Sequence, residues 1–204
     1  MAIQAVVFDF GKVISFPPEA SVMETLASIA GVAKPVMDDL VWKYRGDYDR
    51  GTVSAKAYYQ TVLEHGGVSV SESDIERMIQ IDLQSWTHIN PETVALMEAV
   101  KRAGYTLGIL SNMPHDFLAL ARSSFPVFGL PQVSVFSCEV GSIKPEEEIY
   151  RVLLDKASCK PEDVVFFDDI PINVDKAKDL GIQAFLWKSP KDARSVMRRI
   201  GIIL

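Results

Sequence analysis

The chain has 204 residues, of which 48% are apolar and 24% charged, and its formal net charge is −6 at pH 7. This composition excludes a disordered chain and suits one domain, or one domain with an inserted subdomain, around a sizeable core. The acidic balance argues against a nucleic-acid partner, which requires a basic face, but it permits a small anionic ligand in a locally positive pocket.

The N-terminal segment and the cysteines favour a cytoplasmic protein without a membrane partner. No apolar run reaches the roughly 18 residues of a membrane-spanning helix, and the first residues lack the basic region and cleavage site of a secretory signal. Cys138 and Cys159 are too few for a disulfide framework. We expect both cysteines to be reduced residues with a packing role.

Four short apolar runs predict buried parallel strands. They are rich in β-branched and aromatic residues without strict alternation, which is typical of strands covered on both faces. A further short strand is expected within "VSVFSCEV" at 133–140. The four runs lie near residues 5–10, 105–112, 164–169 and 183–187.

Helical patterns lie between these strands. The segment 90–104 has Asn90 as a plausible N-cap and Gly104 as a stop. Further helices are expected within 146–157 and 173–181. Strands that alternate with helices indicate an α/β fold with a doubly wound, Rossmann-like parallel sheet.

Residues 16–88 interrupt this alternation. They show helical periodicity with almost no strand signal, and Ser54 and Ser71 are plausible N-caps. The segment is too long for a crossover loop. We therefore predict a core domain formed by 1–15 and 89–204, with 16–88 as an inserted helical subdomain.

Polar side chains stand where three of the predicted strands end. In an open α/β sheet, ligands bind outside the carboxyl ends of the strands. Clustered carboxylates suit Mg²⁺, and one of them can act as a nucleophile through an aspartyl-phosphate. A lysine and a hydroxyl can bind the phosphoryl oxygens. These residues are Asp9, Ser111, Asn112, Asp168 and Asp169, with Lys144 in a loop able to reach the same edge.

In this order, the residues resemble the four motifs of the haloacid dehalogenase-like (HAD) hydrolase superfamily. The matching segments are "VVFDFGKVI", "GILSNM", "GSIKPEEEIY" and "VVFFDDIPINVDKAKDLG". They span nearly the whole chain, and the 16–88 segment lies where the family's helical C1 cap belongs. The stretch "YDRGTVSAKAYYQ" resembles the cap of the branch that includes sugar-phosphate phosphatases and the N-terminal phosphatase domain of soluble epoxide hydrolases.

The resemblance implies a role for each matching position. Asp9 corresponds to the nucleophile and a Mg²⁺ ligand, and the Gly11 carbonyl to a second ligand. Ser111 and the Asn112 backbone N–H would bind phosphate, and Lys144 would contact both phosphate and nucleophile. The remaining positions are Asp169 as a metal ligand, Asp168 in a supporting position, and Asn173 where many members carry a second acid.

Gly11 departs from the phosphatase pattern. Phosphatases of the family usually carry a second Asp at this position, and general acid–base help of this kind is typically worth about 10²–10⁴-fold in rate. Three interpretations follow: a phosphatase whose substrate has a good leaving group, such as a sugar 1-phosphate; a metal-free 2-haloacid dehalogenase; and a weakly active pseudo-phosphatase. The acidic pair of Asp168 and Asp169 favours a metal, and hence a small phosphorylated metabolite as substrate.

The inserted helices are expected to select the substrate. Aromatic residues at helical spacing commonly belong to a core, so each assignment competes with a packing role. The candidate contacts are Tyr44, Arg45, Tyr48, Arg50, Trp86 and His88, together with His115 beyond the second strand.

Overall fold

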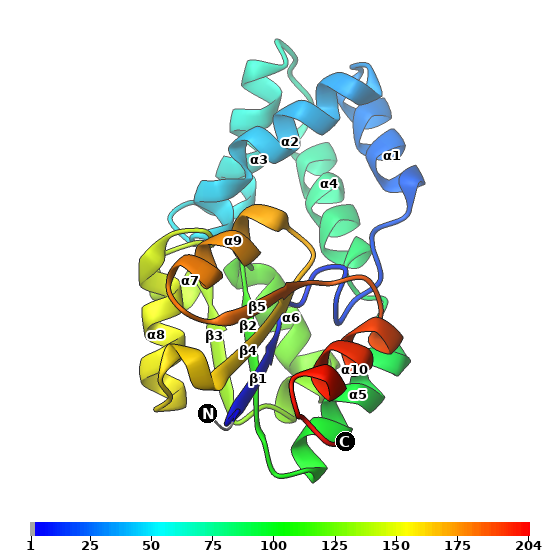
Figure 1. Cartoon of the computed structure of the whole chain (residues 1–204). Coiled ribbons are helices and arrows are strands. Elements are labelled where there is room, and N and C mark those ends of the chain that lie inside the picture. The colour runs from blue at the N-terminus through cyan, green and yellow to red at the C-terminus, as the bar shows by residue number, and fades with distance from the viewer. Residues whose placement is uncertain (1–2) are drawn as a thin grey trace.

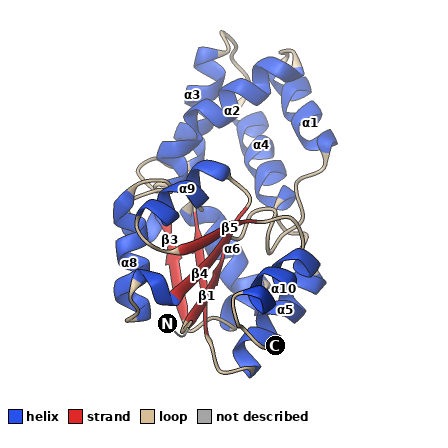
Figure 2. Cartoon of the chain, viewed as in Figure 1, coloured by secondary structure: helices blue, strands red, loops and turns tan. Residues whose placement is uncertain are grey.

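A parallel β-sheet forms the centre of the molecule (Figure 1, Figure 2). The computed structural model describes residues 3–204, and within them the sheet has five strands in the order β3-β2-β1-β4-β5. Every neighbouring pair runs parallel, which confirms the predicted doubly wound α/β fold. The strands are β1 (Ala5–Phe8), β2 (Thr106–Ser111), β3 (Val133–Phe136), β4 (Val164–Asp168) and β5 (Gln183–Leu186).

Helices cover both faces of the sheet because side chains alternate along each buried strand. Val6 and Phe8 of β1 pack into one apolar cluster, while Ala5 and Val7 pack into a second cluster on the opposite face. The first cluster is covered by α5 (Pro91–Arg102), α6 (His115–Ser124) and α10 (Pro190–Arg199), and the second by α8 (Glu147–Ala157) and α9 (Pro171–Asp179). The short helix α7 (Ser137–Val140) follows β3, and 3₁₀ turns occupy Pro126–Gly129 and Pro161–Asp163.

The predicted helices within 90–104, 146–157 and 173–181 correspond to α5, α8 and α9. Asn90 caps α5, since its side chain accepts hydrogen bonds from the backbone N–H groups of Glu92 and Thr93. Helices α6 and α10 were not predicted from the sequence.

Four further helices lie between the end of β1 and the start of α5. They are α1 (Ala20–Ala30), α2 (Lys34–Asp49), α3 (Ala55–His65) and α4 (Glu72–Ser85), and they enclose an apolar cluster of their own. Ser54 and Ser71 cap α3 and α4 as predicted.

The chain leaves the core and returns to it along two adjacent segments. Ser15 and Ile89 form an antiparallel bridge, and the Phe16 N–H donates to the His88 carbonyl at 2.7 Å. This pairing and the separate apolar cluster support our proposal that residues 16–88 are a cap subdomain inserted into a core of 1–15 and 89–204.

The C-terminal end of α2 is fastened to the core. Arg50 forms two hydrogen bonds with the Glu146 carboxylate, at 2.6 and 2.7 Å, and the Ser137 hydroxyl donates to the Asp49 carbonyl at 2.5 Å. The guanidinium of Arg50 lowers the pKa of Glu146 to about 2. The cap therefore contacts α7 and the loop before α8 through one end of one helix.

Cys138 and Cys159 are unpaired thiols, and Cys138 is buried. None of the helices within residues 3–204 has both the length and the apolarity needed to cross a membrane.

We predict that Gly51→Ala destabilises the protein more than Gly31→Ala. Both glycines have a left-handed backbone, with φ of 80° and 69°, which costs an L-residue about 1–2 kcal/mol. A Cβ at Gly51 would also lie 2.7 Å from His115 Nε2, whereas one at Gly31 would meet no atom within 4 Å. Urea denaturation should show the larger loss for Gly51→Ala, with partial recovery when His115→Ala is added; equal losses would contradict the contact.

Candidate active site

Asp9 lies directly beyond β1, at the carboxyl edge of the sheet. Its backbone N–H donates to the Phe167 carbonyl at 2.9 Å, which continues the pairing of β1 with β4. The residue is only 6% exposed. An apolar strand buried on both faces thus places a carboxylate at the floor of a cavity.

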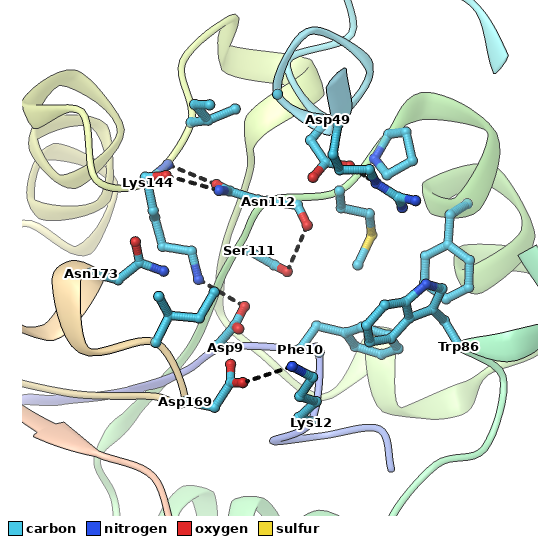
Figure 3. A pocket seen from close by; sticks show the side chains of 18 of the residues that line it. Asp9, Phe10, Lys12, Asp49, Trp86, Ser111, Asn112, Lys144, Asp169 and Asn173 are labelled. Atoms are coloured by element: carbon cyan, nitrogen blue, oxygen red, sulfur yellow. Dashed lines mark hydrogen bonds and ion pairs between the residues drawn. The ribbon is translucent and has the colours of Figure 1, made fainter. Parts of the chain in front are cut away.

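The Lys144 ammonium contacts the ends of three strands, and Figure 3 shows its ion pair with Asp9. Its Nζ lies 2.8 Å from Asp9 Oδ1 and 2.5 Å from Asp168 Oδ2, and it donates to the Leu110 carbonyl at 3.0 Å. The side chain is almost wholly buried. The predicted nucleophile, lysine and supporting aspartate are therefore brought together.

Asn112 positions the loop that carries Lys144. The Lys144 N–H donates to Asn112 Oδ1 at 2.7 Å, and Asn112 Nδ2 donates to the Lys144 carbonyl at 3.0 Å. Ser111, at the end of β2, is buried beside them and lines the same cavity. The Asn112 side chain thus supports the loop, a role that the sequence pattern did not reveal.

The two adjacent aspartates after β4 have different surroundings. Asp168 is fully buried, and its oxygens accept hydrogen bonds from Lys144, from the Asn173 side chain and from the Ile170 N–H. Asp169 is partly exposed and pairs with Lys12, whose Nζ is 3.5 Å away. Asp168 is therefore committed to supporting contacts, while Asp169 is available at the cavity wall.

Negative charge exceeds positive charge in this buried cluster. Burial raises the pKa of Asp9 to about 7, an effect that Lys144 opposes and that Asp168 reinforces. Burial also raises the pKa of Asp169. Burial lowers the pKa of Lys144, but the charges of Asp168 and Asp9 outweigh it and raise that pKa overall.

The carboxylate cluster suits a hard divalent cation. One oxygen each from Asp9, Asp168 and Asp169 can be chosen so that all three lie within 4.8 Å of one another. Oxygen donors of this kind match the preference of Mg²⁺, and a cation would offset the excess negative charge.

A cavity of about 410 Å³ opens above these residues. Gly11, Ser111, Asn112, Asp169 and Asn173 line its floor together with Asp9 and Lys144. Its upper walls are mostly apolar side chains from the cap and the core. These are Phe10, Trp42, Trp86, Met113, Phe117 and Ile143.

Arg45 and Trp86 are the two of the seven predicted substrate contacts that line this cavity. Arg45 also holds two carboxylates. It donates from Nε to Asp49 Oδ1 and from Nη1 to Asp82 Oδ2, both at 2.8 Å. The face of α2 that reaches the cavity comprises Trp42, Arg45, Gly46 and Asp49. Their spacing of three and four residues is that of one helical face, which is the signal that identifies Trp42 and Asp49.

The other five predicted contacts do not line this cavity, and four of them pack against or pair with other residues. The Tyr44 ring packs on His65, with centroids 4.5 Å apart, and Tyr48 is buried against Tyr58 in the cap core. Arg50 pairs with Glu146, and His115 packs against Gly51. Trp86 lines the cavity, whereas His88 does not.

Comparison with known proteins identifies relatives of this arrangement. A model of the haloacid dehalogenase-like hydrolases matches residues 3–181. Bifunctional epoxide hydrolase 2 of Rattus norvegicus is 33% identical over 116 residues, which are 55% of this chain and 20% of that protein, so the chain spans about a fifth of that relative's length. A phosphatase of Mycobacterium tuberculosis is 24% identical over 196 residues, which are 91% of this chain and 88% of that protein.

A solved structure shares the fold. A HAD family enzyme of Bacteroides thetaiotaomicron, in complex with magnesium and inorganic phosphate, superposes with a TM-score of 0.72 at 20% identity, covering 92% of this chain and 96% of that one. Because the family match extends over most of the sequence, this chain belongs to the haloacid dehalogenase-like hydrolases.

Proposed function

We propose that the protein is a Mg²⁺-dependent phosphatase that hydrolyses a small phosphorylated metabolite through an aspartyl-phosphate at Asp9. The observation that carries the proposal is the buried Lys144 ammonium, which contacts Asp9 and Asp168 beside the Ser111 hydroxyl. A phosphatase among the relatives, and a neighbour that binds magnesium and phosphate, support the same chemistry.

The floor of the cavity supplies the nucleophile and the phosphate-binding groups. A carboxylate oxygen of Asp9 attacks phosphorus, and the bond from phosphorus to the leaving oxygen breaks. Water then attacks phosphorus and releases inorganic phosphate, which regenerates the Asp9 carboxylate. Lys144, Ser111 and the Asn112 N–H bind the phosphoryl oxygens during both displacements.

Asp9, Asp169 and the Gly11 carbonyl would hold the metal. Bound there, Mg²⁺ supplies positive charge that stabilises the negative phosphoryl oxygens. Asp168 and Asn173 act indirectly, because their contacts hold Lys144 and the start of α9 in place. A metal-free dehalogenase fits this arrangement less well, since it has no use for three clustered carboxylates.

We predict that Asp9→Asn lowers phosphate release by about 10³-fold or more, because an amide is a poor nucleophile. The assay uses a panel of phosphate monoesters with Mg²⁺. Asp175→Asn is the matched control, since this carboxylate lies on α9 and its side chain is 71% exposed. Equal turnover by wild type and Asp9→Asn would contradict the mechanism, and halide release from a 2-haloacid in EDTA would favour the dehalogenase.

We predict that Mg²⁺ raises the Tm of the wild-type protein and that Asp169→Asn abolishes the gain. The raised pKa of Asp9 means that the folded protein binds more protons than the unfolded chain between about pH 4 and 7. The metal-free protein therefore loses stability as pH rises through that window, and Mg²⁺ offsets the loss. The gain in Tm should be larger at about pH 8 than at about pH 5. A gain in Asp169→Asn equal to that of wild type would contradict the metal site.

A further inference from the structure

The place beside Gly11 is filled by an indole ring. A Cβ built at Gly11 would lie 3.3 Å from Cζ3 of Trp86 and 3.8 Å from its Cη2. Trp86 therefore lies against the position that a side chain at residue 11 would occupy. The site has an apolar surface at this point, where most phosphatases of the family have an acid.

The other proton-carrying groups of the cavity wall are already paired. Outside the carboxylate cluster, the described lining residues that can carry a transferable proton on a charged side chain are Lys12, Asp49 and Lys144. Lys144 is paired with Asp9 and Asp168. Lys12 lies 3.5 Å from Asp169, and Asp49 accepts a hydrogen bond from Arg45 at 2.8 Å. Arg45 itself does not deprotonate in proteins. Each charged group that could protonate a departing alkoxide is therefore already held by a protein partner.

The upper walls are suited to a flat apolar group. Phe10, Trp86 and Trp42 of α2 all line the cavity, and Figure 3 labels the first two. Trp42 is 50% exposed, although a tryptophan ring usually loses most of its exposed surface on folding. An exposed indole at the wall of a cavity is available to pack against a bound ligand.

Polar groups for a polyol are scarce on the same walls. Away from the floor, the charged side chains are Lys12, Arg45 and Asp49, and each is paired with another protein group. The Asn112 amide is occupied by the Lys144 backbone. A sugar in this cavity would regain few of the hydrogen bonds to water that it loses, which costs binding free energy.

We propose that the substrate is an aryl phosphate, that is, a phosphate monoester of a flat phenol-type alcohol. This inference rests on the phosphatase function proposed above and names the substrate class of the same site. Phenols ionise near pH 10 and alcohols near the pKa of water, about 16, so a phenolate leaves without the acid that an alkoxide requires.

The reaction balances without an internal acid. Asp9 Oδ bonds to phosphorus as the bond to the aryl oxygen breaks, and the phenolate leaves with that electron pair. Water then attacks phosphorus, and phosphate leaves with Asp9 restored. The proton lost by this water reaches the phenolate through solvent, so that the products are a phenol and inorganic phosphate.

The test compares phenyl phosphate with benzyl phosphate, which share an aromatic ring but differ in leaving group. Since an acid is worth about 10²–10⁴-fold, we expect kcat/KM for phenyl phosphate to exceed that for benzyl phosphate by about 10²-fold or more. Ring-substituted phenyl phosphates should react faster as the pKa of the phenol falls. Glucose 1-phosphate, with a good leaving group on a polyol, should be turned over more slowly than phenyl phosphate.

Four outcomes would overturn the proposal. Equal kcat/KM for the phenyl and benzyl esters, or faster turnover of the sugar phosphate, would overturn the substrate class while leaving the phosphatase intact. A selective loss of benzyl ester turnover in Asp49→Asn or Lys12→Met would show that the wall donates a proton. Absence of Asp9-dependent phosphate release from every ester would overturn the proposed function as well.

Variants on α2 test the wall separately. Trp42→Ala should lower kcat/KM about tenfold for phenyl and benzyl esters alike, because both lose the same aromatic contact. Val36→Ala is the matched control, since Val36 is also exposed on α2 but lies outside the cavity. An equal effect of the two substitutions would show that Trp42 does not contact the ring.

Discussion

The ion pairs of Lys144 are the interaction on which the site depends. A buried ammonium is unfavourable unless opposite charges surround it, and here Asp9 and Asp168 do so from the ends of β1 and β4. Removal of one partner from such a buried pair typically costs about 3–5 kcal/mol. The same contacts therefore fix the catalytic geometry and join the sheet edge to the loop before α8.

The cap completes this site from above through α2 and through Trp86 at the end of α4. One face of α2 presents Trp42, Arg45 and Asp49 to the cavity, while the end of the same helix is fastened to the core by Arg50 and the Asp49 carbonyl. Helical side chains three and four residues apart share a face, so Trp42, Arg45 and Asp49 can all line the cavity. The attachment to the core lies at the end of the same helix. The contacts that hold the cap in place thus also set the position of the cavity wall.

The sequence predicts the residues at the floor of the cavity but only some of those that line its walls. Asp9, Ser111 and Asp168 follow parallel strands, and the topology of such a sheet brings these ends together at one edge. For α2 no comparable rule applies, because the pattern indicates a helix without fixing which face turns to the cavity. Tyr44 and Tyr48 were therefore assigned to the substrate although they pack on other side chains. The α10 segment gives a weak helical pattern because charged and polar residues dominate it.

The position of Trp86 changes the meaning of Gly11. From the sequence alone, a glycine in place of an acid suggests a loss of function, since only the missing side chain is visible. In the structure the vacated place is occupied by an indole that continues the wall formed by Phe10. The two residues are thus a matched pair: a larger side chain at position 11 would require Trp86 to move, and a smaller one at position 86 would leave a gap in the wall. Such a wall offers the leaving group apolar contact instead of a proton. The rate of phosphoryl transfer then depends on how readily the leaving group departs as an anion.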